Sequence, residues 1–212
     1  MDLYIRENYL KKIRGFYHAD DLIKVITGVR RSGKSSLMQM IADELKSSGI
    51  PESQIIYFDL DKREYRNVVT ADKLEALIMS KCVTDEMKYL FIDEVQNVKD
   101  FETVLNGFRT EGNWSIFITG SNSYLLSGEL VTKLTGRYIE FEIFPLNFQE
   151  YEGMKAFFGK PINSNPMIEL TNYILEGGFP RAILFDDMAD KRKYVQGVVS
   201  EIFEKDIRKR LK

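Results

Sequence analysis

Apolar and polar positions follow two patterns along the chain, one typical of buried strands and one typical of amphipathic helices. Short apolar runs predict strands at 22–27, 54–59, 88–93, 115–119 and 138–144. Apolar residues that recur every three or four positions predict helices at about 35–48, 71–81, 101–110, 123–134, 167–175 and 188–210. This alternation predicts an α/β fold in which helices cover both faces of a parallel sheet.

A change of composition near Pro145 divides the chain in two. We expect a nucleotide-binding core over residues 1–150 and a small helical part over 151–212, with a loop or linker at 159–166. The segment 198–212 ends inside a charged amphipathic pattern without a helix stop signal. We therefore expect the natural protein to continue into a further C-terminal domain.

Composition narrows the class of protein. The chain has 212 residues, 44% of them hydrophobic, and a net charge of −2, so charge alone favours neither nucleic acid nor an anionic membrane. One cysteine, Cys82, and one histidine, His18, argue against an internal disulfide, a metal cluster and His-based catalysis. No run approaches about 18 apolar residues and no signal-peptide pattern is present, so we expect a soluble, cytoplasmic protein without a membrane partner.

Residues 28–35 match the P-loop pattern G-x-x-x-x-G-K-[ST], between a predicted strand and a predicted helix. Gly28 and Gly33 permit turns that let successive N–H groups face phosphate oxygens. Lys34 would contact the β- and γ-phosphates, and the Ser35 hydroxyl would bind Mg²⁺. The alternative is a glycine turn without a ligand. The nucleotide-binding residues that we expect here are Gly28, Val29, Arg30, Arg31, Ser32, Gly33, Lys34, Ser35 and Ser36.

An apolar strand pattern ends in two carboxylates, Asp93 and Glu94, in the form of a Walker B motif. At the end of a buried strand, Asp93 could orient Mg²⁺ through a coordinated water. Glu94 would polarise the attacking water as a general base. The alternative is a strand that ends in two solvated acids, but the P-loop upstream favours hydrolysis. The same pair disfavours a small-molecule kinase, which does not need this glutamate.

The next predicted strand runs into Ser121 and Asn122. Either side chain, at the tip of a strand beside the Asp-Glu strand, could touch the γ-phosphate and the attacking water. A plain Gly-Ser-Asn turn is the alternative. Both residues are therefore candidate catalytic residues.

Arginines near the expected site have several interpretations. Arg137 lies at a helix-to-strand corner and could stabilise charge on the γ-phosphate of a neighbouring subunit. Its alternative is a surface pair with Glu140 or Glu142. Arg30 and Arg31, inside the P-loop, could contact phosphate or a partner chain, or face solvent.

The segment 176–182 contains two glycines and a proline, which fix a tight turn between two predicted helices. Pro180 or Phe179 could pack on an adenine ring, and Arg181 could approach the phosphates. A helix–helix turn without ligand contact is the alternative.

In this order, the P-loop, the Asp-Glu strand, the Ser-Asn tip, the corner arginine and the Gly-Gly-Phe-Pro-Arg turn resemble the AAA+ ATPases. They look most like prokaryotic ATPases in which the AAA domain precedes a C-terminal domain of poorly defined function. The matching stretches are 27–36, 90–96, 118–123, 134–138 and 178–180.

The resemblance implies a P-loop NTPase three-layer sandwich with a five-stranded parallel sheet of order 5-1-4-3-2. It implies a helical lid over about 166–212 and ATP with Mg²⁺ as ligands. It also implies that Ser121 or Asn122 is sensor 1, that Arg137 is a candidate arginine finger and that Pro180 meets the base, as in signalling ATPases.

Together these features predict an ATPase module that hydrolyses Mg-ATP to ADP and phosphate as a conformational switch. The alternative is an ATP-gated DNA-binding module of the replication-initiator or transposition-helper kind, and a small-molecule P-loop kinase is a third class. The partners we consider are a second copy of the chain, with Arg137 acting in trans, an unidentified protein, and DNA, which the net charge does not indicate.

Overall fold

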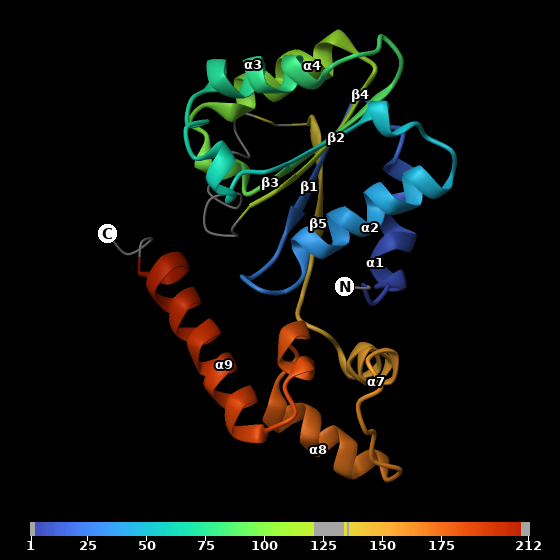
Figure 1. The fold of residues 1–212 in the computed structure, drawn as a ribbon, viewed down its shortest axis with the longest axis vertical. Helices are drawn as coiled ribbons and strands as arrows, with labels where there is room; N and C mark the ends of the chain where they lie inside the picture. Colours follow the sequence, from blue (N-terminus) through green and yellow to red (C-terminus); the bar gives the residue numbers. More distant parts are fainter. Residues whose placement is uncertain (1–2, 121–133, 135, 209–212) are drawn as a thin grey trace. The chain divides into compact units, whose positions relative to one another are not determined.

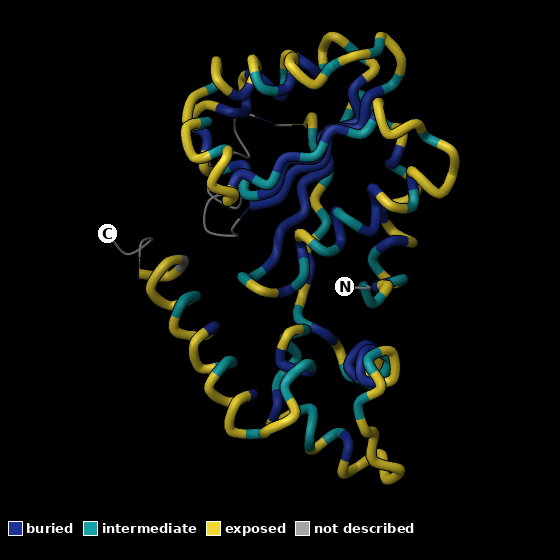
Figure 2. Tube along the Cα trace, in the orientation of Figure 1, coloured by how far each residue is buried: buried dark blue, intermediate teal, exposed yellow. Residues whose placement is uncertain are grey.

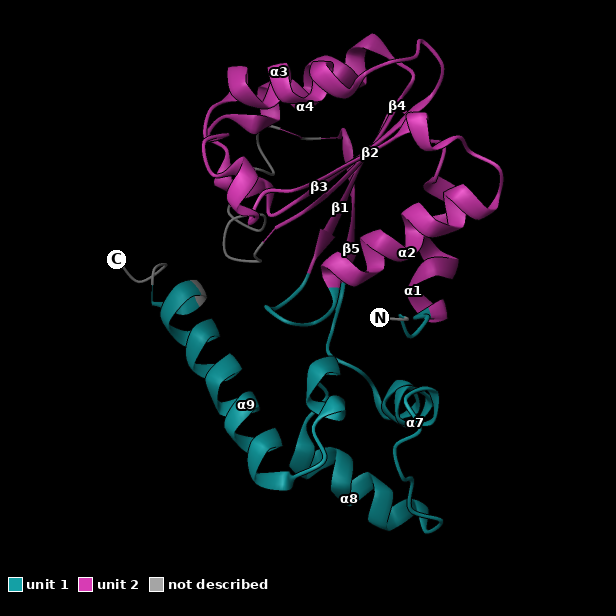
Figure 3. Cartoon of the chain, in the orientation of Figure 1, with its two compact units in different colours: residues 1–6, 28–33, 143–212 teal, residues 7–27, 34–142 magenta. Residues whose placement is uncertain are grey.

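The computed structural model describes residues 3–120, 134 and 136–208, which belong to two compact units (Figure 3). The first, here called the sheet unit, comprises Glu7–Thr27 and Lys34–Glu142. The second, here called the helical unit, comprises Met1–Arg6, Gly28–Gly33 and Ile143–Lys212. Each unit is described below by itself.

The sheet unit is built on five strands. They are β1 (Ile23–Thr27), β2 (Ile55–Asp59), β3 (Lys88–Asp93), β4 (Trp114–Thr119) and β5 (Tyr138–Glu142). Their order is β2-β3-β4-β1-β5, and each neighbouring pair is parallel. This is the expected order 5-1-4-3-2 read from the other edge, so the predicted fold class is confirmed. The carboxyl ends of all these strands meet at one edge of the sheet.

Helices cover both faces of this sheet (Figure 1). The helices of the sheet unit are α1 (Glu7–Ile13), α2 (Lys34–Ser47), α3 (Ala71–Lys81) and α4 (Phe101–Glu111). Figure 1 shows α3 and α4 on one face and α1 and α2 on the other. Short 3₁₀ helices lie at η1 (Arg14–Phe16), η2 (Glu52–Gln54), η3 (Arg63–Tyr65) and η4 (Val95–Asn97).

Successive side chains of a strand point to opposite faces of the sheet, so apolar strands require helices packed on both faces. Val25, Ile92 and Ile116 point to one face and pack with Leu74 and Phe101 of α3 and α4 in one apolar cluster. Every residue of β1, β3 and β4 is buried, as Figure 2 shows in dark blue. The predicted three layers therefore enclose a parallel sheet that is buried on both faces.

The helical unit contains α7 (Phe148–Phe157), α8 (Pro166–Glu176), the 3₁₀ helix η5 (Pro180–Leu184) and α9 (Met188–Glu201). After α9 the chain continues as a π-helical segment, η6 (Ile202–Ile207), so the helix predicted over 188–210 is α-helical only in its first part. The helix expected at 123–134 lies outside the described residues except for Leu134. Among the described residues, no helix has the length and apolar character needed to span a membrane.

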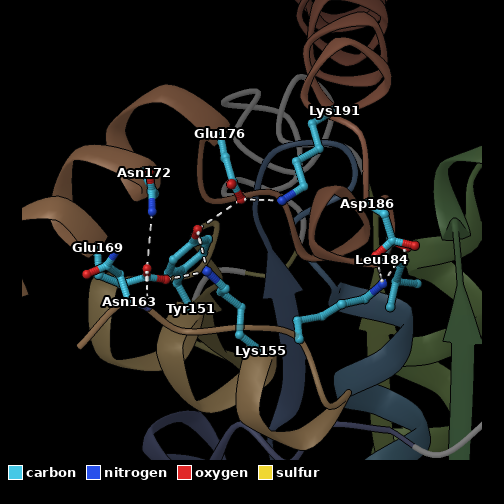
Figure 4. Close-up of polar contacts among 10 residues, drawn as sticks. Tyr151, Lys155, Asn163, Glu169, Asn172, Glu176, Leu184, Asp186 and Lys191 are labelled. Atoms are coloured by element: carbon cyan, nitrogen blue, oxygen red, sulfur yellow. Dashed lines mark hydrogen bonds and ion pairs between the residues drawn. The ribbon is translucent and has the colours of Figure 1, made fainter. Parts of the chain in front are cut away.

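Buried ion pairs join the helices of this unit (Figure 4). Lys155 of α7 pairs with Glu169 of α8. Lys191 of α9 pairs with Glu176 of α8 at 2.7 Å, and the Tyr151 hydroxyl donates to the same carboxylate at 2.9 Å. Since α7, α8 and α9 each contribute at least one charge, this network fixes their packing.

Helix α7 was not predicted, and the boundary expected at residue 150 falls inside it. Its start carries a reciprocal capping box, in which Asn147 and Glu150 each accept the other's backbone N–H. Its middle contains Gly153, which lowers the helical signal of the sequence. A Cβ at Gly153 would collide with the Tyr4 hydroxyl, so a larger residue there requires Tyr4 to shift.

Candidate functional site

Three polar side chains meet at the carboxyl edge of the sheet, inside the sheet unit. Asp93 ends β3 and is only 3% exposed. The hydroxyl of Thr119, which ends the neighbouring strand β4, donates to the Asp93 carboxylate. The Ser35 hydroxyl, in the first turn of α2, also hydrogen-bonds to Asp93. The structure thus places the P-loop serine beside the strand aspartate.

Glu94, the next residue, has a constrained backbone. Its φ of 57° and ψ of 46° lie in the left-handed region, which non-glycine residues rarely adopt and which functional sites often contain. The Thr119 hydroxyl accepts the Glu94 N–H at 3.1 Å, and the Gln96 side-chain amide donates to the Glu94 carboxylate. Backbone and side chain are therefore both held in place.

Burial dominates the electrostatics of these two acids. It raises the pKa of Asp93, while hydrogen bonds from Ser35 and Thr119 lower it and the nearby Asp59 raises it. Burial also raises the pKa of Glu94, against the hydrogen bond from Gln96 and the charge of Lys34. Two carboxyl groups that are kept from water in this way favour a nearby cation.

The residues at this edge fit a magnesium ion that arrives with a phosphate ligand. Among the described residues, no group of three or more His, Cys, Asp or Glu side chains is arranged to hold a metal. Ser35 and Asp93 supply two adjacent oxygen donors. Mg²⁺ prefers such hard donors, keeps several waters and commonly shares its coordination with substrate phosphates.

Residues 28–33 of the P-loop belong to the helical unit. Gly28 has a φ of +145° and Gly33 a φ of +105°, and a Cβ at Gly28 would collide with the Ile143 carbonyl oxygen. Ser32 is fully buried, yet its hydroxyl has no hydrogen-bond partner among the described residues. Buried hydroxyls are normally satisfied, so this one indicates a polar ligand.

The helical unit also gathers several candidate residues from its C-terminal part. Pro180 Cγ lies 4.0 Å from the position that a Cβ would take at Gly33. Burial raises the pKa of Tyr194, and the charges of Arg31 and Arg181 lower it, so both cations lie near this tyrosine of α9. The structure therefore brings the segment after α8 and the P-loop residues of this unit together.

The other candidate residues lie at the corner before β5, at the start of α2 or outside the described residues. Arg137 is exposed at the corner before β5, where its carbonyl oxygen accepts the Ile23 N–H at 2.9 Å. Lys34 is buried at the start of α2, whereas Ser36 is half-buried. Ser121 and Asn122 lie outside the described residues.

Three residues of the site were not predicted from the sequence. They are Thr119 and Gln96, which hold the two acids, and Asp59, which is in register with Asp93 on the adjacent strand β2. Thr119 and Asp59 each end a predicted strand, and a polar residue at that position was the available signal. Gln96 carried no comparable signal.

A separate cavity in the helical unit has a volume of about 360 Å³ and lies among α7, α8 and the start of α9. Its six charged side chains are paired with one another, as Lys155–Glu169, Lys191–Glu176 and Lys160–Asp186. These pairs explain the polar lining without a ligand, so we assign the cavity no binding role.

Comparison with known proteins places the chain in a family. The family described as AAA domain matches residues 20–152. The chain belongs to this AAA family. An uncharacterized protein of Haemophilus influenzae is 38% identical to it over 206 residues, which are 95% of this chain and 50% of that protein. An uncharacterized protein of Methanocaldococcus jannaschii is 36% identical over 191 residues, 87% of this chain and 42% of that protein. The chain thus spans about half the length of these curated relatives, or less.

Solved structures show the same fold at low identity. The ADP complex of Hsp104 from S. cerevisiae matches with a TM-score of 0.60 and 16% identity, over 99% of this chain and 33% of that chain. AMPPCP-bound DnaA from Aquifex aeolicus matches with a TM-score of 0.53 and 20% identity, over 99% of this chain and 67% of that chain. The chain therefore combines membership of an AAA family with an AAA+ P-loop fold.

Proposed function

We propose that this AAA module binds Mg-ATP and hydrolyses it to ADP and phosphate, and that the reaction works as a conformational switch. The observation that carries the proposal is the hydrogen-bonded group of Ser35, Asp93 and Thr119, with Glu94 next to it. It joins a P-loop serine to the strand acids in one unit of the fold. Family membership supports nucleotide binding independently.

These four residues and the P-loop each have a distinct part in the proposed reaction. Lys34 offsets charge on the β- and γ-phosphates, and the N–H groups of residues 28–36 hold phosphate oxygens. Ser35 and Asp93 would hold the metal ion, which neutralises charge that develops on the transferred phosphoryl group. Glu94 accepts a proton from the attacking water. Thr119 keeps Asp93 and the Glu94 backbone in place.

We propose further contacts to the nucleotide from candidate residues outside this group. Pro180 packs on the adenine and Arg181 approaches the phosphates, whereas Ser121 or Asn122 senses the γ-phosphate. Arg137 acts in trans in a homo-oligomer, which its exposure at the corner before β5 supports. We propose a cytoplasmic location and an unidentified protein partner for the longer protein that the relatives' lengths indicate.

Steady-state ATP hydrolysis, measured as phosphate release against protein concentration, tests the proposal. Glu94→Gln serves as the blank and Lys34→Ala as the variant that should not bind ATP. Specific activity that rises with concentration supports a site completed between subunits, and Arg137→Ala then becomes the next variant. Constant, Glu94-dependent activity supports a monomeric switch. Equal ATP affinity in Lys34→Ala and the unsubstituted protein contradicts the P-loop assignment.

The two alternatives predict different results in the same preparation. An ATP-gated DNA-binding module, the alternative supported by the fold likeness to a DNA replication initiation factor, retains duplex DNA only with ATP and loses it steeply as salt rises. A small-molecule kinase needs an acceptor. Phosphate released to water at the full rate of ATP consumption contradicts that class.

A further inference from the structure

One buried guanidinium group, that of Arg6, connects the P-loop backbone to the start of α7 within the helical unit. Its Nε and Nη2 atoms donate to the two carboxylate oxygens of Glu150, at 3.0 and 2.7 Å. Its Nη1 donates to the carbonyl oxygens of Ser32 and Phe144, both at 3.0 Å. Arg6 and Glu150 are each 4% exposed, so water competes little for these bonds.

The Glu150 end of this network is itself fixed. The Asn147 side chain accepts the Glu150 N–H at 2.9 Å, and the Glu150 carboxylate accepts the Asn147 N–H at 3.1 Å. The same carboxylate therefore caps α7 and receives the guanidinium fork. Both Glu150 carboxylate oxygens accept hydrogen bonds from Arg6, and the carboxylate is fixed at the start of α7. The start of this helix therefore sets the plane of the Arg6 guanidinium.

The Ser32 end of the network determines the direction of one P-loop amide. In a trans peptide the C=O and N–H groups point in opposite directions, so a Ser32 carbonyl turned toward Arg6 turns the Gly33 N–H away from it. Gly33, with a φ of +105°, lacks the side chain that would otherwise restrict this peptide. Backbone N–H groups at such positions contact nucleotide phosphates in P-loops.

We propose that Arg6 is a positioning residue for the nucleotide, which presets the Gly33 N–H for a polyphosphate before the ligand binds. This inference rests on the proposed nucleotide binding. Arginine is required because its planar fork serves a carboxylate and two carbonyl groups at once. Lysine, a point charge on a flexible stem, cannot hold all three in fixed directions.

The test compares ATP affinity, by titration calorimetry with Mg²⁺, in the unsubstituted chain and in Arg6→Lys and Glu150→Gln. Arg14→Lys is the matched control, because Arg14 also forks onto carboxylates, Glu7 and Glu44, but at the surface of the sheet unit. We expect Arg6→Lys to weaken ATP binding on the order of tenfold, the size expected when a hydrogen bond to a charged group is misdirected. Glu150→Gln keeps the helix cap, since glutamine also serves at that position, and should weaken binding by a smaller factor.

Hydrogen exchange in the nucleotide-free protein separates positioning from simple stability. We expect Arg6→Lys to speed exchange in peptides that cover residues 28–34 and to leave those from α3 unchanged. A lower melting temperature with unchanged ATP affinity of the folded protein would overturn the inference. If Arg6→Lys does not fold, Glu150→Gln decides, and unchanged affinity there overturns it.

The reference variants distinguish a failure of the role of Arg6 from a failure of nucleotide binding itself. If the unsubstituted chain binds ATP and Lys34→Ala does not, but Arg6→Lys and Glu150→Gln bind normally, only the role of Arg6 fails. If the unsubstituted chain does not bind ATP at all, the proposed function fails and the role of Arg6 fails with it.

Discussion

The hydroxyl of Thr119 donates a hydrogen bond to the carboxylate of Asp93, across the adjacent ends of β4 and β3. The same oxygen accepts the N–H of Glu94 at 3.1 Å. One threonine thus fixes both acids of the candidate site, the first through its side chain and the second through its backbone. Two neighbouring parallel strands place Thr119 beside Asp93, and Glu94 is the first residue after β3.

Thr119→Val should separate ATP binding from hydrolysis. Valine fills the same volume but leaves the Glu94 N–H without its partner and removes one of the hydrogen bonds to the Asp93 carboxylate, while that from Ser35 remains. We expect ATP affinity to change less than about threefold, while turnover falls roughly 10- to 100-fold, as for other residues that orient metal ligands. Phosphate release and calorimetry measure the two quantities. Thr119→Ser, which keeps the hydroxyl, should retain most activity, and equal loss in both variants would contradict the role.

Glu94→Gln should block the chemical step alone. The amide cannot accept a proton from water, but the contacts to metal and phosphate remain. We therefore expect ATP affinity close to that of the unsubstituted chain and turnover lower on the order of 10²-fold or more. Single-turnover phosphate release measures the step directly. Unchanged turnover would show that another group acts as the base.

Lys24 makes stability depend on pH. It is fully buried in β1, with its ammonium group near the carbonyl oxygens of Ala19 and Leu22 and the Ser115 hydroxyl, and burial lowers its pKa from 10.5 to about 7. Between about pH 7 and pH 10 the unfolded chain holds a proton that the folded chain has released. The free energy of unfolding should therefore rise with pH in this window, by at most about 1.4 kcal/mol per pH unit.

Urea unfolding at pH 7, 8 and 9 checks this dependence. Lys24→Met should remove the rise, whereas Lys46→Met, on the exposed side of α2, should keep it. Parallel curves for the Lys24 variant and the unsubstituted chain would contradict the assignment.

Two helical glycines should respond in opposite ways to alanine. Around Gly107, in α4, a Cβ would meet nothing within 4 Å, so Gly107→Ala should stabilise the protein by roughly 0.5–1 kcal/mol through the helix propensity of alanine. At Gly153, in α7, the Cβ would press on the hydroxyl end of Tyr4, whose ring contacts that of Phe157 edge to face. We expect Gly153→Ala to destabilise by about 1–3 kcal/mol, measured by urea unfolding. A gain in both variants would show that Tyr4 moves freely.

Glu169 should be essential to the helical unit as one half of an ion pair. Its side chain is fully buried, and hydrogen bonds from Lys155, the Asn163 N–H and Asn172 lower its pKa against the opposing effect of burial. Glu169→Gln leaves Lys155 buried without a counter-charge, and we expect a loss of about 3–5 kcal/mol in the free energy of unfolding.

The double variant Lys155→Met, Glu169→Leu provides the control. Because it removes both buried charges, it should recover most of that loss. Hydrogen exchange in peptides from α7 and α8 locates the effect, and equal losses in the single and double variants would contradict it.

The fold follows largely from local patterns. The sequence pattern predicted each strand to within two residues. For β1, β3 and β4 the reason is that strands buried on both faces require continuous apolar segments. The edge strand β5 instead alternates apolar residues with Glu140 and Glu142. The strand order came from the resemblance to AAA+ proteins, since periodicity carries no information on which strands pair. Helix α1 was missed because only Leu10 and Ile13 are buried in its seven residues, too few to define a period.

The candidate site was predicted less completely. Gly33, Lys34, Ser35 and the two acids belong to motifs whose spacing is local, so the sequence indicates them. The hydrogen bonds of Thr119 depend on the pairing of β3 with β4. Those of Arg6 depend on Glu150 and Phe144, which are more than 100 positions away, and on Ser32, which is 26 positions away. Such partners are set by tertiary packing, and one sequence offers no pattern for them.

The helical unit is assembled from three separate stretches of chain, Met1–Arg6, Gly28–Gly33 and the segment after Glu142. No single cut can release it whole, and exchange of the C-terminal helices with those of another AAA protein would leave the other two stretches mismatched. Recombination at this boundary should therefore succeed only when the amino-terminal residues and the P-loop travel with the helices. Residues 28–33 of the P-loop therefore belong structurally with the C-terminal part of the chain, whereas Lys34 and Ser35 belong to the sheet unit.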